Sequence, residues 1–331
     1  MYKREEVDSL FSYLSGGQLP LVAFIGVMFA FVATCFFIGK LGQYLPKDIG
    51  RAYAHDGKLS AGKPRGAGFI FILVFLASAL LFAPVKMEIV IYLILVFAAM
   101  MTGFLDDAAK APWGEYKKGI LDLVIAVLVA VTYLKYNDNI VTFATCGRSV
   151  TIPVVLYGIL IVILIWASIN VTNCSDGVDG LSGTLTIITV MSIYVINELL
   201  GKGADFNYLM LLFVVCILGY LWFNATPSKL LMGDAGSRAM GLFIAMAVLK
   251  SGSPFIYLAV AIVLILDGGL GLIKVALLRF LKIHILKNVR TPLHDQVRKV
   301  NGWSNTQTVF RFAIIQIVVS VALIYVIKMG M

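Results

Sequence analysis

The sequence predicts an all-α polytopic membrane protein with about ten transmembrane helices. Of its 331 residues, 60% are hydrophobic and only 14% are charged, whereas about a quarter of the residues in a soluble globular domain are charged. The apolar residues form long unbroken runs, most of them near the roughly 20 residues that a helix needs to cross a bilayer. A single soluble domain is the alternative, but it could not bury this much apolar sequence.

Ten apolar runs qualify as spans, and no internal repeat divides them, so we expect one integral membrane domain over residues 1–331. Acidic residues at Glu5, Glu6 and Asp8 precede the first run, so the N-terminus does not resemble a cleaved signal peptide. The candidate spans are 19–42, 67–84, 89–105, 119–135, 153–171, 182–200, 207–223, 239–250, 254–283 and 309–328.

The ninth run is too long for a straight helix. Continued to Lys287, it would extend about 50 Å at 1.5 Å per residue, whereas the hydrocarbon core is about 30 Å thick. It also contains Asp267 beside Gly268 and Gly269. We therefore expect a broken or strongly bent helix, whose basic second half reaches the cytoplasmic interface.

The distribution of basic residues predicts the orientation. Alternation along the chain puts on one side the loops 43–66, 106–118, 172–181, 224–238 and 284–308. These loops hold 14 lysines and arginines, against 8 in the opposite loops and chain ends. Because cytoplasmic loops carry the excess of positive charge, we expect the five loops in the cytoplasm and both termini outside.

The net charge of +9 indicates anionic membrane lipids and an anionic substrate as partners. A nucleic acid is not expected, because DNA binding would need a soluble basic domain. The four cysteines are scattered, with neither metal-ligand nor disulfide spacing.

Polar residues gather on the predicted cytoplasmic side, where charge at the edge of the hydrocarbon is costly and therefore points to function. Asp106 and Asp107 end the third run, with Lys110 close behind. Two carboxylates at a helix C-terminus oppose the helix dipole, which a cation would relieve. The alternative is a pair of carboxylates solvated at a helix end.

The segment 170–181 is rich in amides, carboxylates and glycines. Asn170 and Asn173 are three residues apart and share a helix face. Glycines such as Gly177 let a backbone approach a ligand, and the next helix would offer free N–H groups to an anion. A polar turn capped by Asp176 or Asp179 is the alternative.

Asp234 is flanked by glycine and precedes the eighth run, with Asn224 upstream. Carboxylate oxygens suit Mg²⁺, which takes one or two carboxylates and substrate phosphates, and no His/Cys cluster favours zinc. A simple N-cap is the alternative. In the first loop, cations at Lys58, Lys63 and Arg65 would bind phosphates or lipid headgroups. No P-loop is present, which argues against an ATPase.

Three motifs in this order resemble the polyprenyl-phosphate N-acetylhexosamine-1-phosphate transferases, and the resemblance covers nearly the whole chain. The matched motifs are GFLDDAAK at Gly103–Lys110, NVTNCSDGVDGL at Asn170–Leu181 and FNATPSKLLMGDAGS at Phe223–Ser237. The resemblance implies a Mg²⁺-dependent membrane enzyme in which undecaprenyl phosphate attacks the β-phosphorus of a UDP-linked amino sugar and UMP leaves. It also suggests a homodimer.

The resemblance carries roles onto matching positions. Asp234 would bind Mg²⁺, and Asp106 would orient or deprotonate the lipid phosphate. The other implied contacts are Asp107 and Asp176 near the phosphates and metal, Lys110 on the diphosphate, Asp179 and Asn224 on the nucleoside, Leu231 where an aromatic residue often stacks on uracil, and His294 on the diphosphate or sugar.

The branch that uses UDP-N-acetylmuramoyl-pentapeptide is most similar, but two features depart from it. Only His294 matches its three consecutive histidines, and Lys63–Gly68 is nearer the branch that uses UDP-N-acetylglucosamine. Transfer of N-acetylglucosamine-1-phosphate therefore stays an alternative. An ion-coupled transporter is a remote one, since transporters place their acids near the bilayer midplane and only Asp267 lies that deep.

Overall fold

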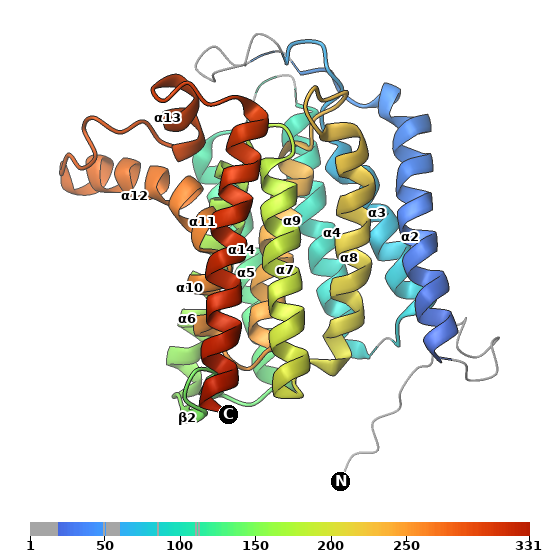
Figure 1. Cartoon of the computed structure of the whole chain (residues 1–331), viewed down its shortest axis with the longest axis vertical. Helices are drawn as coiled ribbons and strands as arrows, with labels where there is room; N and C mark the ends of the chain where they lie inside the picture. The colour runs from blue at the N-terminus through green and yellow to red at the C-terminus, as the bar shows by residue number, and fades with distance from the viewer. Residues whose placement is uncertain (1–18, 49, 51–59, 85, 110, 112) are drawn as a thin grey trace.

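The computed structural model is a bundle of long helices, as the sequence predicts (Figure 1). It describes residues 19–331 except 49, 51–59, 85, 110 and 112, so the predicted character of residues 1–18 lies outside the described part. The long helices are α2 (Leu19–Leu41), α3 (Ala67–Phe82), α4 (Met87–Asp107), α5 (Glu115–Tyr136), α6 (Val154–Cys174), α7 (Leu181–Leu200), α8 (Ala204–Asn224), α9 (Gly233–Lys250) and α14 (Asn305–Gly330).

Seven helices in the described part are long and apolar enough to cross a membrane, and a bent helix pair would make an eighth. The other two predicted spans are also helices. Helix α3 has only 16 residues, and α9 carries charged residues at Asp234, Arg238 and Lys250.

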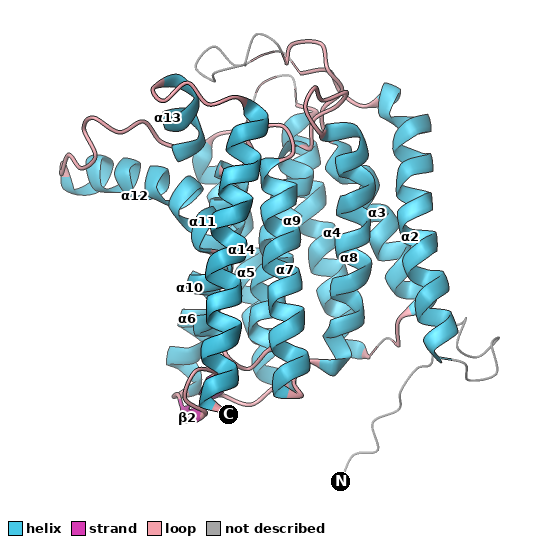
Figure 2. Ribbon diagram, in the orientation of Figure 1, coloured by secondary structure: helices cyan, strands magenta, loops and turns pink. Residues whose placement is uncertain are grey.

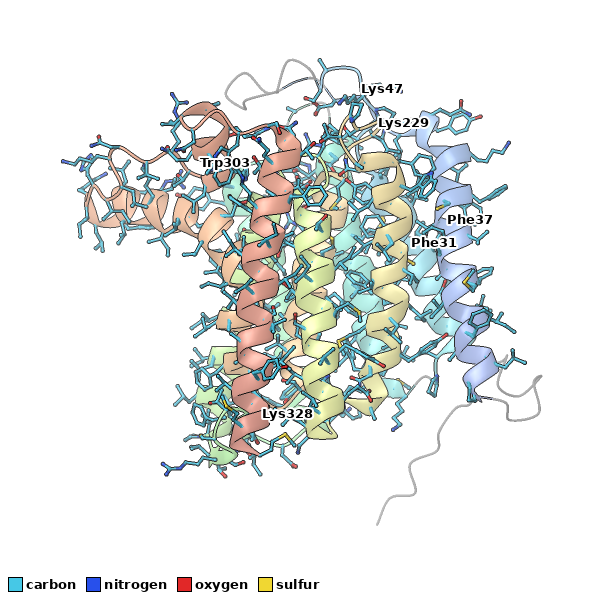
Figure 3. The ribbon with its side chains drawn as sticks, viewed as in Figure 1. Phe31, Phe37, Lys47, Lys229, Trp303 and Lys328 are labelled. Atoms are coloured by element: carbon cyan, nitrogen blue, oxygen red, sulfur yellow. The ribbon has the colours of Figure 1, made fainter. Side chains whose placement is uncertain are left out.

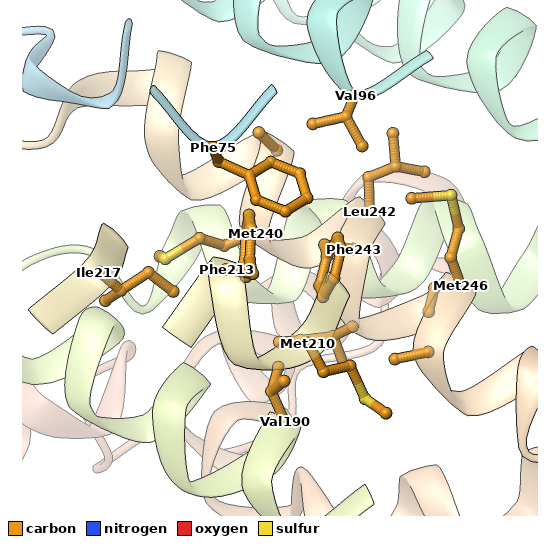
Figure 4. Packing of buried hydrophobic residues seen from close by; sticks show 14 of the residues in the cluster. Phe75, Val96, Val190, Met210, Phe213, Ile217, Met240, Leu242, Phe243 and Met246 are labelled. Carbon is orange, nitrogen blue, oxygen red and sulfur yellow. The ribbon is translucent and has the colours of Figure 1, made fainter. Parts of the chain in front are cut away.

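Helix α9 forms the centre of the bundle. Seventeen of its 18 residues are buried, and it packs mainly against α4 and α6. Around Phe243, the rings of Phe213 and Phe75 complete an aromatic core, with centroids 3.9 Å apart for Phe213–Phe243 and 5.4 Å for Phe75–Phe243 (Figure 4). Helix α9 begins at Gly233, six residues before the predicted apolar run. Its charged first turns can lie inside the bundle because other helices, and not lipid, surround them.

Glycines bring three helices into close contact at the start of α9. A β-carbon at Gly68 of α3 would collide with the backbone of Gly236, and one at Gly103 of α4 with the backbone of Asp234. The main chains of α3 and α4 therefore lie directly against the first turn of α9.

The ninth predicted span is broken, which confirms that prediction. Its two parts, Pro254–Val260 and Ile262–Leu281, meet at an angle of 70°. Gln316 of α14 bridges the break, accepting from Val263 N at 3.0 Å and donating to Ala259 O at 3.0 Å. Backbone groups freed inside a membrane need such partners. The break lies at Ala261 rather than at the glycines after Asp267.

The broken span consists of short pieces, and its second part projects sideways from the bundle (Figures 1 and 2). The pieces are η2 (Pro254–Ile256), α10 (Tyr257–Val260), α11 (Ile262–Leu264), the π-helical turn η3 (Ile265–Gly269), α12 (Leu270–Ala276) and a second π-helical turn, η4 (Leu277–Leu281). Helix α13 (Leu293–Lys299) follows and leads into α14.

The two ends of the bundle differ in their loops. Lys47, Lys229 and Trp303, from three of the five predicted cytoplasmic loops, lie at one end, and Lys328 lies at the other (Figure 3). The Lys328 end also carries the antiparallel hairpin of β1 (Ile140–Phe143) and β2 (Arg148–Thr151). The predicted grouping of loops therefore agrees with the fold.

Candidate active site

Three predicted carboxylates meet where α4 ends and α9 begins. Asp106 and Asp107 close α4, and Asp234 lies in the first turn of α9. The close contact between Gly103 of α4 and the backbone of Asp234 brings the three carboxylates together. Ala235 N donates to Asp107 Oδ2 at 3.4 Å, and Trp113 N donates to Asp106 Oδ1 at 2.7 Å.

Two cations cross-link these carboxylates. Arg65 lies 2.8 Å from Asp107 Oδ1 and 3.2 Å from Asp234 Oδ1, and it also reaches Asp48 Oδ1 at 3.3 Å. Lys118 of α5 pairs with Asp106 and lies 3.3 Å from Asp234 Oδ2.

We call these six residues the carboxylate network: Asp48, Arg65, Asp106, Asp107, Lys118 and Asp234. With four carboxylates and two cations, the network has a formal charge of −2 when all are ionised. Burial acts to lower the pKa of Arg65, but Asp107, Asp234 and Asp48 outweigh it, so its pKa lies above the ordinary value. Arg65 is therefore a permanent cation of the site.

The network suits a divalent cation that binds oxygen. Asp107 Oδ1 is buried and accepts no hydrogen bond from the described residues, its contact being the ion pair with Arg65. No three His, Cys, Asp or Glu side chains form a complete metal site within the described residues. Mg²⁺ needs no such cage, because it binds through one or two carboxylates and substrate phosphates. Asp234 and Asp107 are the residues that could hold it.

A second ion pair lies one helical turn below the network. Arg238 of α9 pairs with Asp122 of α5, and both side chains are almost fully buried. Arg238 also donates to Lys118 O at 3.4 Å. Asn170 of α6 adds a contact to Asp122, with Nδ2 3.5 Å from Oδ2, and donates to Trp166 O at 2.8 Å. Asn170 therefore lies at a helix interface.

Hydrogen bonds tie the loops at this end to one another. Asn224 Oδ1 accepts from Gly180 N at 2.8 Å, and its Nδ2 donates to Leu230 O at 2.8 Å. Ser228 N donates to Asp179 Oδ2 at 3.3 Å. Leu231 N donates to Pro64 O at 2.7 Å. The segment 225–232 is thus fastened to the loop 175–180 and to the first loop.

Two further predicted residues hold helix ends. Asn173 Nδ2 donates to Ser237 Oγ of α9 at 2.9 Å. Asp176 Oδ1 accepts from Ser182 Oγ at 2.7 Å, which joins the loop to the start of α7. Both therefore position the segments around the site.

His294 lies in the first turn of α13 and contacts the loop 175–180. Its Nδ1 is 2.9 Å from Asp267 Oδ2, and its backbone N donates to Asp267 Oδ1 at 2.7 Å. A β-carbon at Gly177 would collide with Nε2 of the imidazole. Arg298 donates to Gly177 O at 3.3 Å, so α13 is fixed to this loop.

The predicted site residues thus form connected groups, except that Lys58 and Lys110 lie outside the described residues. The sequence pattern missed most cations and outer carboxylates: Asp48, Lys118, Asp122, Arg238, and the partnership of Asp267 with His294. One signal was available. Asp122 follows Lys118 by four residues, and Arg238 follows Asp234 by four, which puts each pair on one helix face.

Comparison with known proteins identifies the class. Residues 89–252 match the family model described as Glycosyl transferase family 4. Together with the helical bundle and its charged site at one end, this match indicates a membrane-embedded transferase.

Several curated relatives carry one name, phospho-N-acetylmuramoyl-pentapeptide-transferase. The protein of Treponema pallidum (strain Nichols) is 42% identical over 300 residues, covering 85% of this chain and 83% of the relative. That of Symbiobacterium thermophilum is 30% identical over 78% and 79% of the two chains, and that of Rickettsia felis 28% over 94% and 93%. The chain belongs to the phospho-N-acetylmuramoyl-pentapeptide-transferase family, which confirms the predicted resemblance.

Proposed function

We propose that the protein transfers phospho-N-acetylmuramoyl-pentapeptide from its UDP-linked form to undecaprenyl phosphate, producing lipid I and UMP in peptidoglycan biosynthesis. The carboxylate network carries this proposal, because its formal charge of −2 with all groups ionised matches one Mg²⁺ and its cations match a diphosphate. The shared name of the relatives supports the choice of donor.

Bound Mg²⁺ would neutralise the charge that develops on the diphosphate, and Asp234, with Asp107 beside it, would hold the ion. The protein's own contribution is positioning and charge stabilisation, as in other phosphoryl transfers. Lys118 and Arg65 already lie among the carboxylates and present fixed positive charge to the phosphates.

Asp106 orients the lipid phosphate, which attacks the β-phosphorus and displaces UMP. Loss of a proton from this phosphate makes small demands, since the second pKa of a phosphate monoester is near 6. Asp106 is fixed by Lys118 and by Trp113 N, so its carboxylate keeps one orientation during the transfer.

The joined loops provide the nucleotide side of the site. Asp179, Asn224 and Leu231 lie in segments that are hydrogen-bonded to one another, and we assign them to the nucleoside. Lys110 and Lys58 remain proposed phosphate contacts. Asp176 and Gly177 lie in the loop next to His294, which we assign to the diphosphate or sugar.

We further propose that the carboxylate network faces the cytoplasm of a bacterial inner membrane. The excess of basic residues in the five loops at that end supports this orientation. It would place the site where soluble UDP-linked donors are found.

The donor is tested by supplying purified protein with Mg²⁺, undecaprenyl phosphate and either UDP-N-acetylmuramoyl-pentapeptide or UDP-N-acetylglucosamine. We expect a lipid-linked product and UMP with the first donor, at a kcat/KM at least 100-fold higher than with the second. Turnover with UDP-N-acetylglucosamine alone would overturn the proposed donor while leaving the reaction class intact.

A further inference from the structure

Asp267 is fully buried in the π-helical turn η3 of the broken span, and the proposed reaction gives it no role. A carboxylate inside a membrane helix is costly and calls for a functional explanation. We propose that Asp267 is a positioning residue that fixes the tautomer of His294, so that Nε2 faces the substrate as a hydrogen-bond acceptor. This inference rests on the proposed function.

Both oxygens of Asp267 engage His294. The backbone N of His294 donates to Oδ1 at 2.7 Å, and Nδ1 of the ring lies 2.9 Å from Oδ2 and 3.1 Å from Oδ1. An ionised carboxylate only accepts hydrogen bonds. Nδ1 therefore carries a hydrogen, and in a neutral ring Nε2 then keeps its lone pair, because the partner of one ring nitrogen decides the state of the other.

The ring edge that bears Nε2 points at the loop with the site carboxylates. Nε2 lies so close to Gly177 that a β-carbon there would collide with it. Gly177 itself is exposed and directly follows Asp176 in the loop. The His294 side chain is itself buried, and the missing side chain at Gly177 lets Nε2 lie directly against the backbone of this exposed loop position.

Arg298 locks this arrangement from the other side. Its Nε donates to His294 O at 3.3 Å, and its guanidinium reaches Gly177 O at 3.3 Å and Asp295 Oδ1 at 2.9 Å. His294 is therefore held at its backbone and at Nδ1, and Nε2 makes no hydrogen bond to the part of the chain that the structure describes. Its lone pair would accept from an O–H of the substrate, such as a sugar hydroxyl or a protonated phosphate.

The substitution Asp267→Asn separates this role from simple packing. An asparagine has the same shape, and its amide oxygen can still accept from the His294 backbone. Its amide N–H₂ would instead donate to Nδ1, which moves the ring hydrogen to Nε2 and removes the acceptor. Asp267→Glu keeps a carboxylate and therefore the tautomer.

The tautomer is measured by nitrogen NMR of the ¹⁵N-histidine-labelled protein in detergent. The chain has three histidines, and His294→Gln assigns the relevant signal. We expect hydrogen on Nδ1 in the parent and in Asp267→Glu, and hydrogen on Nε2 in Asp267→Asn. Hydrogen on Nε2 of the parent protein overturns the proposal whether or not any variant folds.

Kinetics supply the second readout. We expect Asp267→Asn to lower kcat by about 100-fold or more, within the range that a positioned acid or base contributes, with KM for the UDP-linked donor changed less than threefold. Asp267→Glu should recover at least a tenth of the parent kcat. An unchanged kcat in Asp267→Asn contradicts the proposal. Failure of the parent protein to release UMP would instead contradict the proposed function. The NMR measurement would still test the tautomer of His294, because it does not depend on turnover.

Discussion

Each carboxylate oxygen of Asp234 lies beside a different cation, Arg65 on Oδ1 and Lys118 on Oδ2. These cations come from the first loop and from the start of α5, far apart in the sequence. The arrangement makes single side chains decisive, because removal of one partner leaves charge that its neighbours no longer balance. Substitutions of single residues are therefore the sharpest tests of the site.

Lys118→Met should lower kcat/KM for the UDP-linked donor by about 100-fold or more, as expected when one fixed donor to a developing charge is lost. Lys117→Met is the matched control, because Lys117 is exposed and lies over the Trp113 ring at 3.3 Å, outside the network. Release of UMP measures both variants. Equal losses in the two variants would show that Lys118 has no special part.

Gly177→Ala should reduce turnover more than tenfold, because the new methyl group would displace the His294 ring. Gly39→Ala is the control, since its β-carbon would meet only Phe223 at 3.8 Å, an ordinary contact. Steady-state kinetics and an apparent melting temperature are measured for each. Full activity in Gly177→Ala would mean that the ring position is unimportant.

The residues of the site were predictable to unequal degrees. Asp106, Asp107 and Asp234 stand out because carboxylates are rare at the ends of apolar helices. Lys118 does not stand out, and Arg65 was indicated only as a cation for phosphates or lipid headgroups, since basic residues are common in cytoplasmic loops. Which cation meets which carboxylate depends on helix packing, and no sequence pattern records that Arg65 reaches residue 234.

At the scale of helices, α5 and α9 are joined by two ion pairs of opposite sense. Lys118 of α5 meets Asp234 of α9, and one turn further along both helices Asp122 meets Arg238. The second pair is buried and also holds the Lys118 carbonyl. It therefore fixes the position of α5 relative to α9, on which the reach of Lys118 depends.

Arg238→Leu alone should destabilise the protein by about 3–5 kcal/mol, because it leaves Asp122 buried without a counter-charge. The double variant Asp122→Leu/Arg238→Leu should recover most of this loss. Apparent melting temperatures of the singles and the double give the coupling between the two positions. Additive losses in the double variant would rule out the ion pair as a unit.

The helices themselves follow from the apolar runs, and the exceptions have physical causes. Helix α9 begins before its predicted run because the bundle, and not lipid, surrounds its charged first turns. The bend in the ninth span was predictable from its length. Its place at Ala261 was not, because the Gln316 side chain that satisfies the freed backbone groups there comes from a helix later in the chain.

The whole molecule has two unlike ends, and its orientation in the membrane remains a prediction. One end holds the carboxylate network and the loops around it. The other holds the β-hairpin and the end of α14, where Gly330 packs against the backbone of Thr145. The single-domain organisation of residues 1–331 and the homodimer suggested by family resemblance are likewise predictions.

Two single-cysteine proteins test the orientation, once each is shown to release UMP. One keeps Cys146, which is exposed in the hairpin, and the other has Lys229→Cys as its one thiol. A membrane-impermeant maleimide should label Cys146 in intact spheroplasts, and the Lys229→Cys protein only after the membrane is opened. The reverse pattern would place the carboxylate network outside the cell.

We propose that the carboxylate network binds Mg²⁺ through Asp234 and uses it in phosphoglycosyl transfer. The most direct measurement is the rate of UMP release from UDP-N-acetylmuramoyl-pentapeptide during a Mg²⁺ titration that begins in excess EDTA. We expect no turnover in EDTA, recovery with Mg²⁺, loss of at least 1,000-fold in Asp234→Asn, and near-parent activity in the exposed control Glu115→Gln. Full turnover in EDTA, or an active Asp234→Asn protein, would contradict it.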